Sequence, residues 1–199
     1  MQVVTLNPID FEEHTRRLAK SVEDGTGCRF DAIVAVRRGG SFVCDSFCRY
    51  FPVERLGERF DVTLQRPSTK RKEGKVGLLL RHLPRPLLDA MRIAEASMLS
   101  IIKQLKRPSP APTVLFPDRL TDILTRRDRP EILVIDDAID SGDTLAAIVE
   151  TLKLTNPDVS VSIAVITETT SRPRIRADYT LYRNRTLIRF PWSNDYKKN

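Results

Sequence analysis

The chain has 199 residues, a formal net charge of +7 and three cysteines. This length suits one domain with a substantial core, and so few cysteines, in an odd number, argue against a disulfide framework. The longest apolar runs are only as long as a strand, so we expect neither a membrane span nor a signal peptide, and we expect a cytoplasmic protein.

The first predicted element is a helix that begins after residue 7. Asn7 is a suitable N-cap and Pro8 suits the first helical position, where its missing N–H costs nothing. Phe11, Leu18 and Val22 form one apolar stripe. We therefore expect this helix to cover the core with a single face.

A buried strand at 31–36 comes next, followed by a helical stretch through Tyr50. The turn between them carries Arg37, Arg38, Gly39 and Gly40. Two glycines let the backbone come close to a ligand. An ordinary glycine turn between a strand and a helix explains the four residues equally well when they are taken alone.

Two features mark the middle of the chain. A basic stretch between residues 66 and 75 reads either as a solvated loop or, less well, as a nucleic-acid contact, because no aromatic residues interleave with its charges. Residues 84–105 then predict a helix of about five turns with apolar residues at heptad spacing, which suits core packing or a dimer contact.

The segment 131–154 is the most informative part of the sequence. Four consecutive apolar residues at 132–135 predict a strand that is covered on both faces, as in a parallel sheet. A turn and a helix from Leu145 to Leu154 follow. A turn that leads into a helix N-terminus presents unpaired N–H groups and can bind phosphate, with hydroxyls here from Ser141 and Thr144.

Three carboxylates surround this turn. Asp136 and Asp137 come directly at the predicted strand end, and Asp140 lies in the turn itself. They would repel a phosphate unless they bind sugar hydroxyls or a hydrated magnesium ion. An ordinary βα turn with a polar cap accounts for Ser141 and Thr144 but leaves the three carboxylates unexplained.

Further strands are predicted at 159–167 and 179–182. The alternation of strands and helices predicts an α/β fold, a Rossmann-like parallel β-sheet flanked by helices, in one domain that spans residues 1–199.

Residues 132–144 resemble the signature of the type I phosphoribosyltransferases, which bind 5-phosphoribosyl 1-pyrophosphate (PRPP). The resemblance implies that Asp140 is the catalytic base, that Asp136 and Asp137 hold Mg²⁺, and that the turn of Arg37 to Gly40 binds pyrophosphate. It implies PRPP contacts from Asp136, Asp137, Ala138, Ile139, Asp140, Ser141, Gly142, Asp143 and Thr144. It also makes the basic stretch at 66–75 a candidate lid.

The layout is similar to the xanthine-guanine branch of that family. The resemblance implies a small hood built from the N-terminal and C-terminal segments, a helical insertion at about 84–106, and base contacts from Leu187, Ile188 and Trp192. Leu187 stands where the branch has its stacking aromatic, so Phe190 or Trp192 supplies the π surface or the contact is aliphatic. The lysine that binds a 6-oxopurine is absent, and Glu168 lies in that region, where it could accept from an amino group.

The implied activity is a Mg²⁺-dependent transfer of 5-phosphoribose from PRPP to a nitrogenous base, with a purine as the first expectation, and release of pyrophosphate. Purine salvage in the cytoplasm and a homodimer or higher homo-oligomer follow from the resemblance. Nucleic acid is not an expected partner of the enzyme. The alternative is a PRPP-sensing regulator of the same fold that binds RNA or a protein partner without catalysis.

Overall fold

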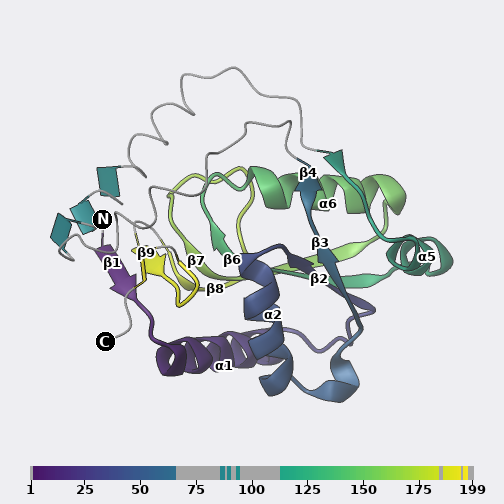
Figure 1. Cartoon of the computed structure of the whole chain (residues 1–199). Helices are drawn as coiled ribbons and strands as arrows, with labels where there is room; N and C mark the ends of the chain where they lie inside the picture. The colour runs from purple at the N-terminus through teal and green to yellow at the C-terminus, as the bar shows by residue number, and fades with distance from the viewer. Residues whose placement is uncertain are drawn as a thin grey trace.

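The computed structural model describes residues 2–65, 86–87, 89–90, 93–94, 113–183, 186–193 and 195–196. The predicted basic loop at 66–75 and most of the predicted helix at 84–105 lie outside these residues. The main sheet has five parallel strands in the order β3-β2-β6-β7-β8 (Figure 1). The predicted Rossmann-like parallel sheet is thus confirmed.

The main strands are β2 (Ala32–Val36), β3 (Glu58–Val62), β6 (Glu131–Ile139), β7 (Ser160–Glu168) and β8 (Tyr179–Tyr182). The helices are α1 (Pro8–Gly25), α2 (Gly39–Tyr50), α5 (Asp118–Arg126) and α6 (Asp143–Thr155), with a 3₁₀ turn η1 at Val53–Arg55. Two short pairs stand apart from the main sheet: β1 (Gln2–Thr5) with β9 (Thr186–Arg189), and β4 (Leu64–Gln65) with β5 (Thr113–Val114).

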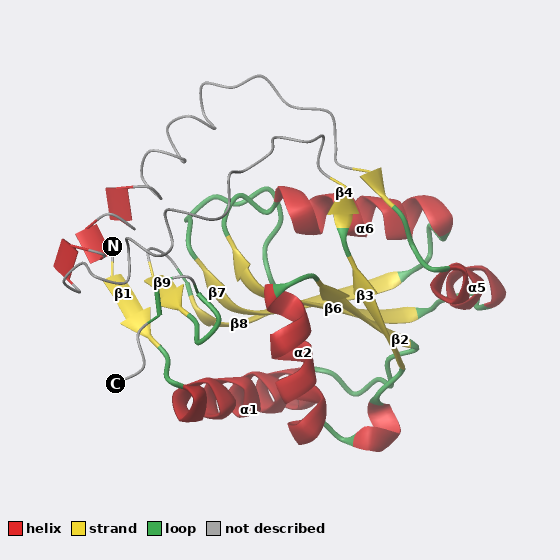
Figure 2. Ribbon diagram, viewed as in Figure 1, coloured by secondary structure: helices red, strands yellow, loops and turns green. Residues whose placement is uncertain are grey.

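Helices cover both faces of the sheet (Figure 2). Val34 and Val134 point into a core cluster with α5 and α6, whereas the adjacent Ile33 and Leu133 point into a second cluster with α1 and α2. All four side chains are buried. The uninterrupted apolar runs of β2 and β6 therefore reflect two covered faces, as a parallel sheet requires.

The first helix begins as the sequence predicts. The Asn7 side chain accepts hydrogen bonds from the N–H groups of Ile9 and Asp10, at 2.8 and 2.9 Å, and Asp10 accepts in return from the Asn7 N–H. This reciprocal capping box satisfies N–H groups that have no partner inside the helix. Among the described helices, none is long and apolar enough to cross a membrane.

Strand β6 is longer than predicted. Its apolar run ends at Ile135, yet the strand continues through both carboxylates to Ile139. The reason is its neighbour: β7 is equally long and offers ladder partners at Val165 opposite Asp136 and at Thr167 opposite Ala138. The sequence predicts a strand that ends at Asp136 and Asp137, whereas β6 runs two residues further, so both carboxylates lie within the strand.

Candidate phosphoribosyl site

The two predicted ligand loops meet at the carboxyl edge of the sheet. Strands β2 and β6 pair in parallel with Ala35 opposite Ile135, so the residues that follow them are neighbours. A Cβ on Gly39 would overlap the carboxyl group of Asp137, and one on Gly40 would lie 2.5 Å from the Ile135 carbonyl oxygen. The backbone approach seen here is therefore open only to glycine.

The nine predicted PRPP contacts lie consecutively at this edge. Residues 136–139 end β6, residues 140–142 form the turn, and Asp143 and Thr144 begin α6. Gly142 has a φ of 78°, a left-handed conformation that favours glycine, and it makes no side-chain cap to the helix. The Asp143 N–H donates to the Ser141 hydroxyl at 3.4 Å, and the N–H groups that follow it, with the positive end of the helix dipole, suit an anion.

The carboxylates of Asp136 and Asp137 are crowded together. Asp136 is 9% exposed and Asp137 is half-buried, and Oδ1 of Asp136 accepts a hydrogen bond of 2.8 Å from the Asp137 N–H. Burial, and then the neighbouring Asp137 charge, raise the pKa of Asp136 well above its ordinary value, and burial also raises the pKa of Asp137. In the part of the chain that the structure describes, no Lys or Arg pairs with either carboxylate.

This donor pair fits a divalent cation. Mg²⁺ commonly binds through one or two carboxylates and completes its shell with waters and substrate oxygens. Across the described residues, no three His, Cys, Asp or Glu side chains assemble into a metal site, so the substrate and water would supply most of the oxygens. Asp136 and Asp137 are accordingly the residues that would hold the ion.

Asp136→Asn should stabilise the metal-free protein at high pH. The pKa of Asp136 is raised by folding, so the folded state binds the extra proton, and stability falls as pH rises from the unfolded value, about 3.9, through the folded one. The uncharged amide in Asp136→Asn does not titrate, so the variant avoids this loss of stability at high pH. We expect Tm to rise by about 3 to 6 °C at pH 8, or about 1–2 kcal/mol, and by much less near pH 4.5.

Circular dichroism melts in EDTA at both pH values would measure the effect. Asp158→Asn, at an exposed position after α6, is the matched control and should shift Tm little at either pH. A gain from Asp136→Asn of the same size at pH 4.5 and pH 8 would contradict an electrostatic origin.

Asp140 is exposed, and its carboxylate is oriented by Thr169, a residue that was not predicted from the sequence as part of the site. The Thr169 hydroxyl donates a hydrogen bond of 2.7 Å to Asp140 Oδ1, while the Thr169 N–H donates to the Ile139 carbonyl at 2.9 Å. Thr169 directly follows β7, and β7 lies beside β6. The sequence could therefore have indicated Thr169, because residues that follow adjacent parallel strands are neighbours at the same edge of the sheet.

The turn after β2 has its own support. Arg37 and Arg38 are exposed, and the peptide bond between them is cis. The Ser41 hydroxyl, in the first turn of α2, donates a hydrogen bond of 2.5 Å to Asp61, which also pairs with Arg59. Burial acts to raise the pKa of Asp61, but the bonds from Ser41 and Arg59 lower it overall, so Asp61 is a charged anchor for this turn.

No family model and no curated protein matches the chain. Solved structures do. A purine phosphoribosyltransferase from Pyrococcus horikoshii superposes with a TM-score of 0.58 at 16% identity, over 96% of this chain and 94% of that one. A Helicobacter pylori xanthine-guanine-hypoxanthine phosphoribosyltransferase gives a TM-score of 0.55 at 18% identity, over 96% and 90%. The chain has the type I phosphoribosyltransferase fold.

A third similar structure is a hypothetical protein from Neisseria gonorrhoeae with bound ppGpp, with a TM-score of 0.60 at 15% identity over 96% of this chain and 89% of that one. All three likenesses extend over almost the whole chain. The resemblance to the type I fold in its purine, xanthine-guanine layout is thus confirmed at the level of architecture.

The predicted base contacts do not share one pocket. Leu187 and Ile188 are buried in β9, which pairs with β1. Trp192 instead lines a cavity of about 320 Å³ between α1, α2 and residues 191–192. Its ring stacks on Phe190 at 4.7 Å and on Phe42 at 4.8 Å between centroids, and Phe190 is itself buried. The rings of Phe190 and Phe42 therefore both stack on Trp192.

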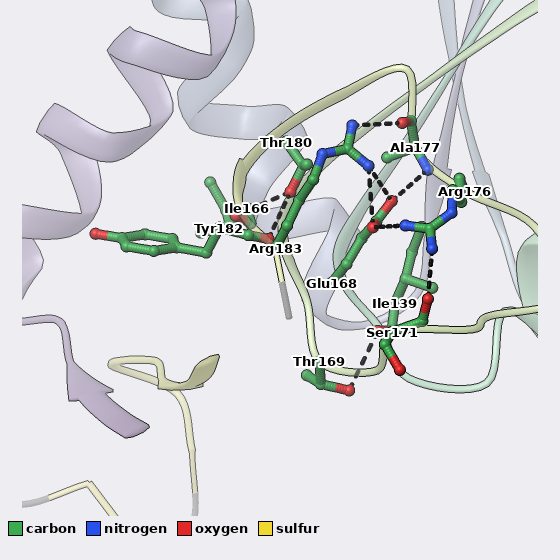
Figure 3. A network of polar contacts seen from close by, with 10 residues as sticks. All are labelled: Ile139, Ile166, Glu168, Thr169, Ser171, Arg176, Ala177, Thr180, Tyr182 and Arg183. Atoms are coloured by element: carbon green, nitrogen blue, oxygen red, sulfur yellow. Dashed lines mark hydrogen bonds and ion pairs between the residues drawn. The ribbon is translucent and has the colours of Figure 1, made fainter. Parts of the chain in front are cut away.

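Glu168 is not free to receive a base amino group. Its side chain is fully buried and accepts hydrogen bonds from Arg176, from Arg183 and from the Ala177 N–H (Figure 3). The interpretation of Glu168 as an acceptor for a base was therefore wrong. Two guanidinium groups and a backbone donor already occupy its oxygens.

Proposed function

We propose that the protein transfers 5-phosphoribose from PRPP to a nitrogenous base, with a purine as the first expectation, and releases pyrophosphate. The arrangement at the end of β6 carries the proposal: a buried and a half-buried carboxylate without a cationic partner in the described chain, next to a helix N-terminus, with a glycine turn against them. The carboxylates suit sugar hydroxyls and a cation, and the helix N-terminus suits a phosphate.

Each part of the site has a task in this reaction. The N–H groups and hydroxyls of residues 140–144 would bind the 5′-phosphate, while Asp136 and Asp137 would hold the ribose hydroxyls, directly or through Mg²⁺. Residues 37–40 would receive the leaving pyrophosphate through backbone N–H groups and the two exposed arginines. Bound Mg²⁺ would supply charge neutralisation at the pyrophosphate. Asp140, oriented by Thr169, would accept the proton from the base nitrogen.

A regulatory role is the second candidate. One structure of this fold contains ppGpp, a phosphate-rich nucleotide that is not a nucleobase, and this favours a ligand-sensing function as the alternative to catalysis. Such a protein would bind PRPP at the same turn and act on RNA or on a protein partner.

A substrate screen separates the two candidates. Hypoxanthine, guanine, xanthine and adenine are each incubated with the protein, PRPP and Mg²⁺, and pyrophosphate release is measured. We expect release with at least one purine and its loss in EDTA. Tight PRPP binding without release on any base would favour the sensor, and no binding of PRPP at millimolar concentration would overturn both.

We further propose a homodimer or higher homo-oligomer that acts in the cytoplasm in purine salvage. One domain with a hood formed by the β1–β9 pair and an insertion near 84–106 is part of the same proposal. The molar mass in solution, from light scattering after size exclusion, would test the oligomer directly.

A further inference from the structure

The buried carboxylate of Glu168, at the end of β7, accepts four hydrogen bonds. Its Oε2 accepts from Nη1 of Arg176 at 3.1 Å, and its two oxygens accept from Nη1 of Arg183 at 3.2 and 3.1 Å. The Ala177 N–H donates to Oε1 at 2.8 Å. A buried carboxylate is costly unless it is paired and hydrogen-bonded, and this one is both.

These bonds close a segment that has no helix or strand of its own. Residues 169–178 connect β7 to β8 without regular structure. Glu168 stands at the start of this segment and binds Ala177 near its end, while Arg176 also donates to the Ser171 carbonyl and Arg183 to the Ala177 carbonyl (Figure 3). The carboxylate therefore fixes both ends of a connection that would otherwise be free to move.

The same segment forms a wall of the phosphate turn. The Arg174 N–H donates a hydrogen bond of 2.8 Å to the Ser141 carbonyl, and a Cβ on Gly142 would lie 2.9 Å from the Ile175 nitrogen. Thr169, at the other end of the segment, binds Asp140. Three consecutive residues of the turn, 140–142, thus rest on the segment that Glu168 closes.

We propose that Glu168 is a positioning residue for the phosphate turn, acting through segment 169–178. The inference rests on the proposed function and adds a role that the sequence did not predict. At this strand end the related purine enzymes are expected to read the base with a lysine, whereas this chain uses the position to hold the donor site in shape. Base selection must then come from residues other than Glu168.

Glu168→Gln tests this role. The amide keeps an acceptor for the Ala177 N–H but loses the charge and turns one acceptor into a donor that faces a guanidinium. Arg176 and Arg183 are 51% and 43% exposed, so water can take over their lost bonds, and the fold should survive. We expect the Kd of ribose 5-phosphate, measured by calorimetry, and the KM of PRPP each to rise about tenfold.

The KM of the base should stay within about twofold, a split that simple loss of folded protein would not produce. Glu150→Gln is the matched control: it removes an exposed ion pair with Arg174 of the same segment, and it should leave the Kd of ribose 5-phosphate unchanged. If Glu168→Gln did not fold, Arg183→Gln would decide, with an expected rise in Kd of about threefold.

The outcomes separate the two proposals. Failure of the wild-type protein to bind ribose 5-phosphate or PRPP would overturn the proposed function, and the role of Glu168 with it. Normal wild-type binding that Glu168→Gln and Arg183→Gln leave unaltered would overturn only the role of Glu168. A tenfold rise in the Kd of ribose 5-phosphate in Glu168→Gln, with no change in Glu150→Gln, would support the role of Glu168.

Discussion

Asp140→Asn should lower kcat by about 10³-fold while the KM of PRPP changes by less than about threefold. The Asp140 carboxylate is exposed, and in the proposed reaction it would accept the proton of the incoming base, which an amide cannot do. The amide oxygen can still accept the hydrogen bond from Thr169, so the geometry of the turn is preserved. The loss should therefore fall on the chemical step and not on binding of the donor.

Steady-state rates of pyrophosphate release, with the best base from the screen, would measure this change. Thr169→Val serves as the graded comparison, because it leaves the Asp140 carboxylate in place and removes the hydroxyl that lies 2.7 Å from Asp140 Oδ1 and 3.3 Å from the Ile139 carbonyl oxygen. We expect about a tenfold loss in kcat from that variant. An Asp140→Asn rate within tenfold of the wild type would show that another group takes the proton.

Gly39→Ala should reduce kcat/KM by more than about 100-fold. The added Cβ would overlap the carboxyl group of Asp137, so either this carboxylate or the turn after β2 must move. In the proposed site the turn would receive pyrophosphate and Asp137 would hold the ribose hydroxyls, and displacement of such a group by about 1 Å can cost about two orders of magnitude in rate. We also expect a loss of about 1–3 kcal/mol in stability from the overpacking.

Gly27→Ala is the matched control for this substitution. A Cβ at Gly27 would meet nothing within 4 Å, so activity and Tm should stay close to the wild-type values. Kinetics and thermal melts of both variants would make the comparison. Full activity in Gly39→Ala would mean that the two loops do not act on the same ligand.

Local patterns predicted the parts of this molecule that depend on neighbouring residues. The cap at Asn7, the covered strand at 132–135 and the turn into α6 each follow from a few adjacent side chains. The pairing of the two ligand loops was also accessible, because parallel strands end at the same sheet edge. These features are sufficient to predict that Asp136, Asp137 and Asp140 lie together at one edge of the sheet.

The rest depends on contacts between distant segments. The sequence does not show that β7 extends beside β6, so the carboxylates looked like the end of a strand and not part of one. Glu168 looked like a free acceptor because its partners, Arg176 and Arg183, come beside it only when the chain turns back to form β8. Trp192 likewise meets Phe42 only through tertiary packing.

The pairing of β1 with β9 has a consequence for biogenesis. Residues 2–5 must wait for residues 186–189 before they gain any partner strand, so this small sheet has a very high contact order. During synthesis strand β6 and the proposed phosphate turn can fold while β9, the C-terminal half of the proposed hood, is still inside the ribosome. If the proposed function holds, the nascent protein would therefore be able to bind the sugar phosphate before it could select a base.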